Sequence, residues 1–311
     1  MKILLFITLF ASISIAEEIK FSALAYYEYS YYSDNYADVS NEFEFRRVYF
    51  GLEKKMSNTL SYKFLTDVGR RSEDGLLEVY LKNAKVDWNT RFGKFVIGMQ
   101  GMNVFDIQKH TWGYRSIDKT AMNKNNWASS ADIGLGYYNN YNRLNYNVLI
   151  TNGTGFKLPE DDSYKKLSTQ VYYGEGKLNS KDGMNSGFVF TYEPYHSEGG
   201  TTESKFIAGL FGGYAAGSFR FGAECGQLMD SDVDESMNII SGYGNYSISN
   251  QFDIFARLDN LNNNSAISNS AILGVAISPE KGLTIMPNIR FISDDNSQYN
   301  YHYNLNFKFS I

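Results

Sequence analysis

The residues with the clearest chemical potential lie in one long segment, QGMNVFDIQKHTWGYRSIDKTAMNKNNWAS, at residues 100–129. It lacks strand periodicity, and a connection of this length in a compact protein is usually functional or disordered. Its aromatic residues, among them Trp112 and Trp127, argue against disorder. If the segment lined a pore, its charges would set ion selectivity. The charges are four cations, a pair of acids and one histidine: Lys109, Arg115, Lys119, Lys124, Asp106, Asp118 and His110.

A catalytic arrangement of nucleophile and base is not visible in the chain. The three histidines are His110, His196 and His302, and Ser197 would point to the opposite face of a strand from its neighbour His196. Cys/His clusters, Gly-rich phosphate loops and cofactor motifs are also lacking. We therefore expect no catalytic residues, no metal and no cofactor. A barrel-based outer-membrane enzyme that works through paired carboxylates remains an open alternative.

The composition favours β-structure and argues against nucleic acid as a partner. The 311 residues include 25 Tyr and 22 Phe but only 4 Pro, and the lone cysteine, Cys225, cannot form an intrachain disulfide. With 29 basic and 34 acidic residues the chain is mildly acidic. Beyond the N-terminus no window is apolar over the length of a membrane-spanning helix, so membrane insertion would require a closed barrel.

Sixteen runs of alternating character, bounded by turn residues, follow the N-terminal region. They fall near residues 19–31, 41–53, 58–69, 75–88, 91–99, 130–140, 142–152, 166–178, 184–194, 204–215, 218–229, 235–247, 251–260, 268–278, 282–293 and 297–311. Tight turns alternate with longer polar loops such as SDNYADVS, which is typical of outer-membrane barrels. The sequence predicts an all-β fold, a transmembrane antiparallel β-barrel of about sixteen strands with the long segment folded into the lumen. A loop packed over the barrel mouth is the alternative.

Several runs have one apolar face and one polar face, as in the terminal YHYNLNFKFSI. An apolar outside and a polar inside is the pattern of a water-filled barrel. Leu149 and Phe255 are exceptions within their runs. In FEFRRVYFGLE, Arg46 or Arg47 would face lipid unless a bulge or the barrel end lies there, since a mid-bilayer arginine costs roughly 2–4 kcal/mol. The run LLEVYLKNAKVDW changes phase and its faces cannot be assigned.

Strand phase assigns a set of charged residues to the lumen. The basic members are Lys63, Arg71, Lys94, Arg143, Arg220, Arg257, Arg290 and Lys308, and the acidic members are Glu28, Asp67, Asp132, Glu224, Asp253 and Asp259. When the charged residues of the long segment are added to these, basic residues outnumber acidic ones in the lumen, and such an excess favours the passage of small anions. Two alternatives stay open. The charges could cancel in a weakly selective or cation-preferring porin, or the barrel could be an adhesive or structural one.

Three stretches carry a resemblance to a known family. They are FEFRRVYFGLEKKMSNTLSYKFLTDVG, LKNAKVDWNTRFGKFVIGMQGMN and WASSADIGLGYY, within residues 41–140. They resemble the N-terminal half of the phosphate-selective porin O and P family. That family has an Arg-Arg pair in an early strand and a long loop before a Ser-x-Asp-Ile-Gly strand. The resemblance implies a sixteen-stranded, homotrimeric outer-membrane channel for small hydrophilic solutes or anions, surrounded by lipid and lipopolysaccharide.

The N-terminus has the pattern of a secretory signal peptide. Lys2 precedes the apolar run Ile3 to Phe10, and Ser14-Ile15-Ala16 fits a small-x-small cleavage site. We therefore expect residues 1–16 to be a signal peptide and residues 17–311 to form one barrel domain. N-terminal sequencing of protein from outer membranes should begin at Glu17. A sequence beginning at Met1 would contradict this assignment.

Overall fold

The computed structural model describes residues 19–33, 41–71, 74–197, 199–232, 235–263, 266–293 and 299–311. The expected signal peptide at residues 1–16 lies outside these ranges and remains a prediction. Among the described residues, no helix is both long enough and apolar enough to span a membrane.

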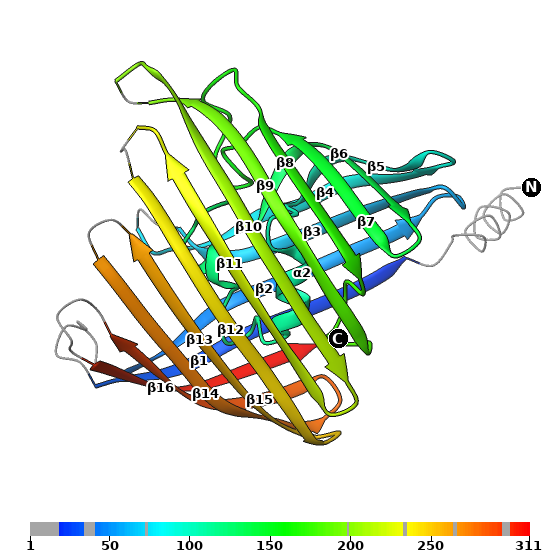
Figure 1. The fold of residues 1–311 in the computed structure, drawn as a ribbon. Coiled ribbons are helices and arrows are strands. Elements are labelled where there is room, and N and C mark those ends of the chain that lie inside the picture. Colours follow the sequence, from blue (N-terminus) through cyan, green and yellow to red (C-terminus); the bar gives the residue numbers. More distant parts are fainter. Residues whose placement is uncertain are drawn as a thin grey trace, which may run out of the picture.

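Sixteen antiparallel strands form a closed barrel in which each strand pairs with its neighbours in sequence and β1 pairs with β16 (Figure 1). The strands are β1 (Lys20–Tyr32), β2 (Asn41–Lys55), β3 (Leu60–Arg70), β4 (Leu77–Thr90), β5 (Gly93–Gly101), β6 (Ala131–Tyr141), β7 (Leu144–Thr151), β8 (Lys166–Gly174), β9 (Gly183–His196), β10 (Thr202–Ala216), β11 (Phe219–Asp230), β12 (Glu235–Ser249), β13 (Phe252–Asn263), β14 (Ala266–Glu280), β15 (Leu283–Ser293) and β16 (Tyr299–Ser310). The predicted closed antiparallel barrel of sixteen strands is confirmed, and each predicted run overlaps one of the strands. Closure leaves no sheet edge unpaired, as a hydrocarbon environment requires.

The two faces of the wall differ as the alternation predicts. Outward side chains are large and apolar, for example Phe43, which is 80% exposed, and Leu258, which is 65% exposed. On β16, Tyr303 faces outward and Asn306 is fully buried on the inner side. The terminal strand therefore presents its apolar face to the surroundings, as its sequence predicts.

A bulge in β2 resolves the Arg-Arg pair. Tyr26 of β1 lies opposite Arg47, and the next residue, Tyr27, lies opposite Phe45, so Arg46 is the extra residue. An extra residue resets the alternation. Phe45 and Val48 can then both face outward while the two arginines between them share the inner face. The predicted bulge is confirmed.

A second bulge explains the phase change in β4. Leu65 of β3 lies opposite Asn83 and Thr66 lies opposite Leu81, so Lys82 is the extra residue. Leu81 is exposed on the outer face, whereas Lys82 is buried. Both bulges therefore insert a cation on the inner face of neighbouring parts of the wall.

The predicted strand at 166–178 is too long, because β8 ends at Gly174. Gly174 has a φ of +102°, a value that side-chain-bearing residues rarely adopt. A Cβ atom there would lie 2.0 Å from the carbonyl oxygen of Met184. The chain turns at this glycine, and residues 175–182 connect β8 to β9.

The connection between β5 and β6, residues 102–130, is called the β5–β6 segment below. It contains the short helices α2 (Asp106–Trp112) and α3 (Ala121–Lys124), and Figure 1 shows α2 between the front and rear walls of the barrel. Trp112 is 1% exposed and packs against Tyr243 and Phe255 of β12 and β13. This contact explains why Phe255 breaks its run: it points inward, onto the β5–β6 segment.

Removing the extra residue of β2 provides a test of the bulge. Deletion of Arg46 should leave a folded barrel, because Phe45, Arg47 and Val48 then alternate without interruption. Deletion of Tyr49, three residues further on, should prevent folding because it moves apolar residues to the inner face. The mobility difference between unheated and boiled samples on a detergent gel reports the folded barrel. Equal tolerance of both deletions would contradict the bulge assignment.

Candidate functional site

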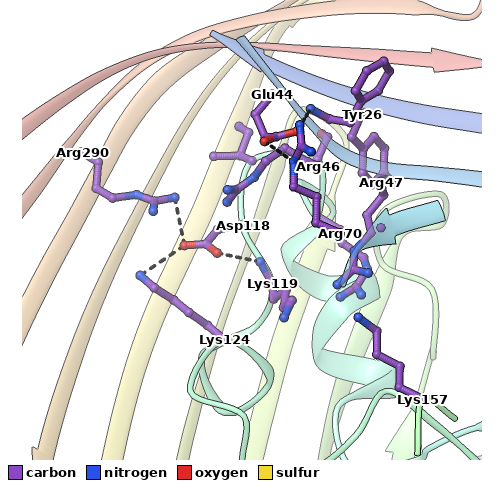
Figure 2. A pocket seen from close by; sticks show the side chains of 15 residues that line it. Tyr26, Glu44, Arg46, Arg47, Arg70, Asp118, Lys119, Lys124, Lys157 and Arg290 are labelled. Carbon is purple, nitrogen blue, oxygen red and sulfur yellow. Dashed lines mark hydrogen bonds and ion pairs between the residues drawn. The ribbon is translucent and has the colours of Figure 1, made fainter. Parts of the chain in front are cut away.

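A cavity of about 420 Å³ lies between the β5–β6 segment and strands β1 to β3. Its lining is strongly basic, with eight cations and only two acids (Figure 2). The cations are Arg46, Arg47, Arg70, Arg115, Lys119, Lys124, Lys157 and Arg290, and the acids are Glu44 and Asp118. We call this site the basic cavity.

The wall of the basic cavity is supplied by the bulged part of β2 and the adjacent end of β3. Arg47 Nη1 lies 3.1 Å from Asp67 Oδ2, and the same carboxylate oxygen is 2.8 Å from the ammonium group of Lys82. Arg70 Nε donates to Glu44 Oε2 at 2.7 Å. Arg47 shares the carboxylate of Asp67 with Lys82, and Arg70 pairs with Glu44. The acids therefore fix the cations in place without cancelling the excess of positive charge.

The opposite side of the basic cavity is the central part of the β5–β6 segment, which Asp118 anchors. Its Oδ2 atom lies 3.2 Å from Lys124 Nζ and 3.0 Å from Arg290 Nη2 of β15 (Figure 2). Burial alone would raise the pKa of Asp118, but the cations Arg290 and Lys124 hold it well below its ordinary value. The carboxylate is therefore ionised at neutral pH and ties the segment to β15.

Backbone groups of the segment are held from the wall as well. The guanidinium of Arg257 on β13 donates to the carbonyl oxygen of Lys119, and Asn306 of β16 donates to that of Ser116 at 3.3 Å. Glu224 of β11 accepts the backbone N–H of Ala121 at 2.9 Å. Polar contacts from several strands thus fix the course of the segment over residues 116–121.

Three cations of the basic cavity have no ion-pair partner among the residues that the structure describes. Arg115 Nη1 donates to the amide oxygen of Asn123 at 3.1 Å, and Lys157 Nζ lies 4.3 Å from the centre of the Tyr80 ring. The ammonium group of Lys119 contacts no carboxylate in the described part of the chain. Burial, followed by the nearby charges of Arg47 and Arg115, lowers the pKa of Lys119 to about 8. These three cations are the groups most available to an anion.

The structure gathers part of the predicted set at the basic cavity. Arg115, Lys119, Lys124, Asp118 and Arg290 all line it. Lys109 and Asp106 lie on α2 and pair with each other instead. They belong to the same segment but not to the cavity.

Two predicted inner-face arginines pack against the β5–β6 segment. Arg220 Nη2 donates to the carbonyl oxygen of Trp112 at 3.2 Å, and its guanidinium lies 5.5 Å from the Tyr114 ring centre. Arg257, which is 1% exposed, pairs with Asp259 at 2.7 Å. Both arginines are used to hold the segment.

The remaining predicted basic residues lie away from the basic cavity. Lys63 pairs with Glu53 at 3.9 Å, and the ammonium group of Lys94 lies 4.6 Å from the Tyr138 ring centre. Lys308 shares the inner face of β16 with Asn306. These positions are dispersed along the barrel.

Two residues assigned to the lumen by strand phase are placed differently. Arg71 follows the end of β3 and pairs with Asp74 in the turn. Arg143 lies in the turn before β7, with its guanidinium 5.1 Å from the Tyr173 ring centre. Strand alternation does not apply outside a strand, which is why the phase argument fails for both.

Sequence reasoning did not assign Arg46, Arg47, Arg70 or Lys157 to the site. The Arg-Arg pair was visible as a break in alternation, and such a break with two adjacent cations is a signal for a bulge that carries both inward. Arg70 and Lys157 had no comparable signal, because their positions depend on how strand ends and loops fold over the cavity.

Comparisons with known proteins show the fold. No protein-family model matches the chain, and no curated protein matches it. Among solved structures, the anion-selective porin from Comamonas acidovorans has a TM-score of 0.71 at 11% identity, covering 94% of this chain and 99% of that one. The outer membrane channel DcaP of Acinetobacter baumannii has a TM-score of 0.68 at 10% identity, covering 94% and 97%. OmpT, an outer membrane protein of Vibrio cholerae in a trimer form, has a TM-score of 0.65 at 12% identity, covering 95% and 100%.

Asp118 should be required for a rigid β5–β6 segment. In Asp118→Asn, the partly buried cations Lys124 and Arg290 lose the buried carboxylate that they share. Breaking a fully buried ion pair costs about 3–5 kcal/mol, which is the upper limit for this change. We expect limited trypsin digestion of the folded barrel to cleave after Lys119 and Lys124 several times faster. Asp106→Asn is the matched control, since its pair with Lys109 is partly exposed and contributes about 0–1 kcal/mol. Equal cleavage rates in the two variants would contradict the anchoring role.

Proposed function

We propose that the chain is a bacterial outer-membrane porin that lets small hydrophilic solutes diffuse through a water-filled channel and prefers anions. The observation that carries the proposal is the basic cavity within a closed barrel whose outer face is apolar. A barrel of sixteen or more strands is wide enough to enclose an aqueous channel rather than a packed core.

The β5–β6 segment would narrow this channel. Its aromatic residues pack against the inner face of β12 and β13, and Asp118 ties it to β15. This leaves the basic cavity as the space between the segment and β1 to β3. We therefore assign Arg115, Lys119 and Lys124 to the constriction, together with the anchoring acid Asp118.

Electrostatics favours anions at this position. A unit charge at a distance of about 5 Å in water changes the energy of a passing monovalent ion by about 0.8 kcal/mol, and the effect grows where less water is present. Arg115, Lys119 and Lys157 lack ion-pair partners among the described residues, so their fields add. Since about 1.4 kcal/mol corresponds to a tenfold ratio, two such charges are sufficient for a clear preference. The acids of the basic cavity, Glu44 and Asp118, are each engaged by cations.

The proposal includes membership of the phosphate-selective porin O and P family. The Arg-Arg pair that carries part of the resemblance forms the bulged wall of the basic cavity, which gives this motif a physical role. We also propose a homotrimer surrounded by outer-membrane lipid and lipopolysaccharide. The trimer form of OmpT, which shares the fold, supports this assembly.

The proposal assigns the chain no enzymatic activity. His196 and Ser197, the adjacent pair considered from the sequence, are engaged separately. The imidazole of His196 packs on Tyr164 with ring centres 5.0 Å apart, and the Ser197 hydroxyl forms a hydrogen bond with that of Thr201 at 2.8 Å. This geometry does not prepare Ser197 as a nucleophile.

Charge reversal in the segment tests the proposal. Replacing Arg115, Lys119 and Lys124 together by Glu should shift the zero-current potential in a salt gradient toward cations, because the change of six charges leaves five cations and five acids in the lining and so removes its positive excess. The measurement uses purified protein in a planar bilayer. An unchanged potential would show that the segment does not line the constriction.

A matched triple variant controls for net charge. Arg143, Lys181 and Lys281 lie in turns outside the strands, so replacing them by Glu changes the total charge equally but away from the basic cavity. We expect this variant to retain the potential of the native channel. An equal shift in both triple variants would mean that overall charge, and not the basic cavity, sets selectivity.

A further inference from the structure

The connection between β7 and β8, residues 152–165, also reaches the basic cavity. Its residue Lys157 is one of the lining cations and is seen in Figure 2 on the same side as Arg47 and Arg70. In the barrel, β5 and β6 separate β7 from β4. The contacts of this connection with Tyr80 of β4, described below, therefore reach across two intervening strands.

The first part of the connection is fixed to the start of β6. The backbone N–H of Asn152 donates to the carbonyl oxygen of Ile133 at 3.1 Å, and that of Gly153 donates to Asp132 Oδ2 at 2.7 Å. Gly155 is buried and has a φ of +84°. A Cβ atom there would lie 2.4 Å from Ser129 Oγ at the end of the β5–β6 segment. Only glycine permits this close approach of the two connections.

The next two residues contact β4. The Phe156 and Tyr80 ring centres are 6.1 Å apart at an interplanar angle of 80°, and the ammonium group of Lys82 lies 4.9 Å from the Phe156 ring centre. The ammonium group of Lys157 lies 4.3 Å from the Tyr80 ring centre. Edge-to-face aromatic pairs and cation–π contacts are each worth about 0.5–1.5 kcal/mol. Together they hold the side chains of Phe156 and Lys157 on the far side of β5 and β6.

We propose that residues 155–157 form a second arm of the constriction, in which Lys157 determines selectivity and Phe156 is a positioning residue that holds it. This inference rests on the proposed channel function. It extends that function because the basic cavity then has cations from two connections, Lys119 and Arg115 from one and Lys157 from the other. A passing anion meets positive charge from both.

The charge environment of Lys157 fits this role. No carboxylate among the described residues forms an ion pair with it, and its charged neighbours Arg47 and Lys82 are already engaged by Asp67. Glu78 of β4 is a second acidic neighbour, but it forms no ion pair with Lys157, and Asp67 is shared by two other cations, so Lys157 keeps its positive charge. Lys157 is exposed, so its charge is open to the solution that fills the basic cavity.

The test is the anion-to-cation permeability ratio of Lys157→Glu, measured from the zero-current potential in a potassium chloride gradient. We expect the ratio to fall at least roughly twofold, because the change of two charges acts at the basic cavity. Lys165→Glu is the matched control: it makes the same charge change in the same connection, but Lys165 pairs with Glu160 outside the basic cavity. Its ratio should equal that of the native channel. Equal shifts in both variants would overturn the proposal.

The outcomes separate this inference from the proposed function. If Lys157→Glu has no effect while the triple variant of Arg115, Lys119 and Lys124 shifts the potential, the second arm is wrong and the porin proposal stands. If neither variant shifts it, both are wrong. For the positioning role, Phe156→Ala should reduce the effect of Lys157→Glu when the two are combined, and Phe156→Tyr should restore it. An undiminished effect in the Phe156→Ala background would overturn the role of Phe156.

Discussion

A strand in contact with lipid can carry an ionised side chain only on its inner face, because an arginine at the bilayer midplane costs roughly 2–4 kcal/mol. Strict alternation then allows at most every second residue to be charged. Two adjacent inward side chains require an extra residue in the strand. Strand β2 has its extra residue at Arg46, beside Arg47, and β4 has its extra residue at Lys82. The bulges thereby concentrate positive charge on one part of the wall without exposing it to lipid. The basic cavity depends on this local departure from regular strand geometry.

The strands from β11 to β16 meet the same constraint differently. Strands β11 to β16 carry inner-face residues that bind the β5–β6 segment: Phe255 packs on its aromatic rings, Arg257 binds its backbone, and Arg290 pairs with Asp118. Buried charges are stable only when paired and hydrogen-bonded. Arg220, Arg257 and Arg290 of these strands therefore bind the β5–β6 segment. Arg115 and Lys119, which have no ion-pair partner among the described residues, lie on the side of the segment that faces β1 to β3.

Much of this architecture could be predicted from the sequence because the bilayer imposes a simple rule on it. Period-2 alternation predicted the sixteen strands, and the break at Arg46 and Arg47 predicted a bulge. The phase change in β4 was recognised, but its cause, the bulge at Lys82, was not predicted. The long segment with Trp112 was visible as a functional element. Residues 71 and 143 were misplaced because they lie just beyond strand ends, where a shift of one residue removes the phase argument. Lys157 was missed because its place depends on Gly155 and Phe156 folding a loop over two strands, and no local pattern reports such a contact.

The central claim is that free cations around the basic cavity make the barrel an anion-preferring channel. The most direct measurement is the zero-current potential of the purified native protein in a planar bilayer under a tenfold potassium chloride gradient. The account predicts discrete channel conductance and a potential whose sign reports chloride permeating faster than potassium. A potential of the opposite sign, or a barrel that conducts no ions, would contradict it.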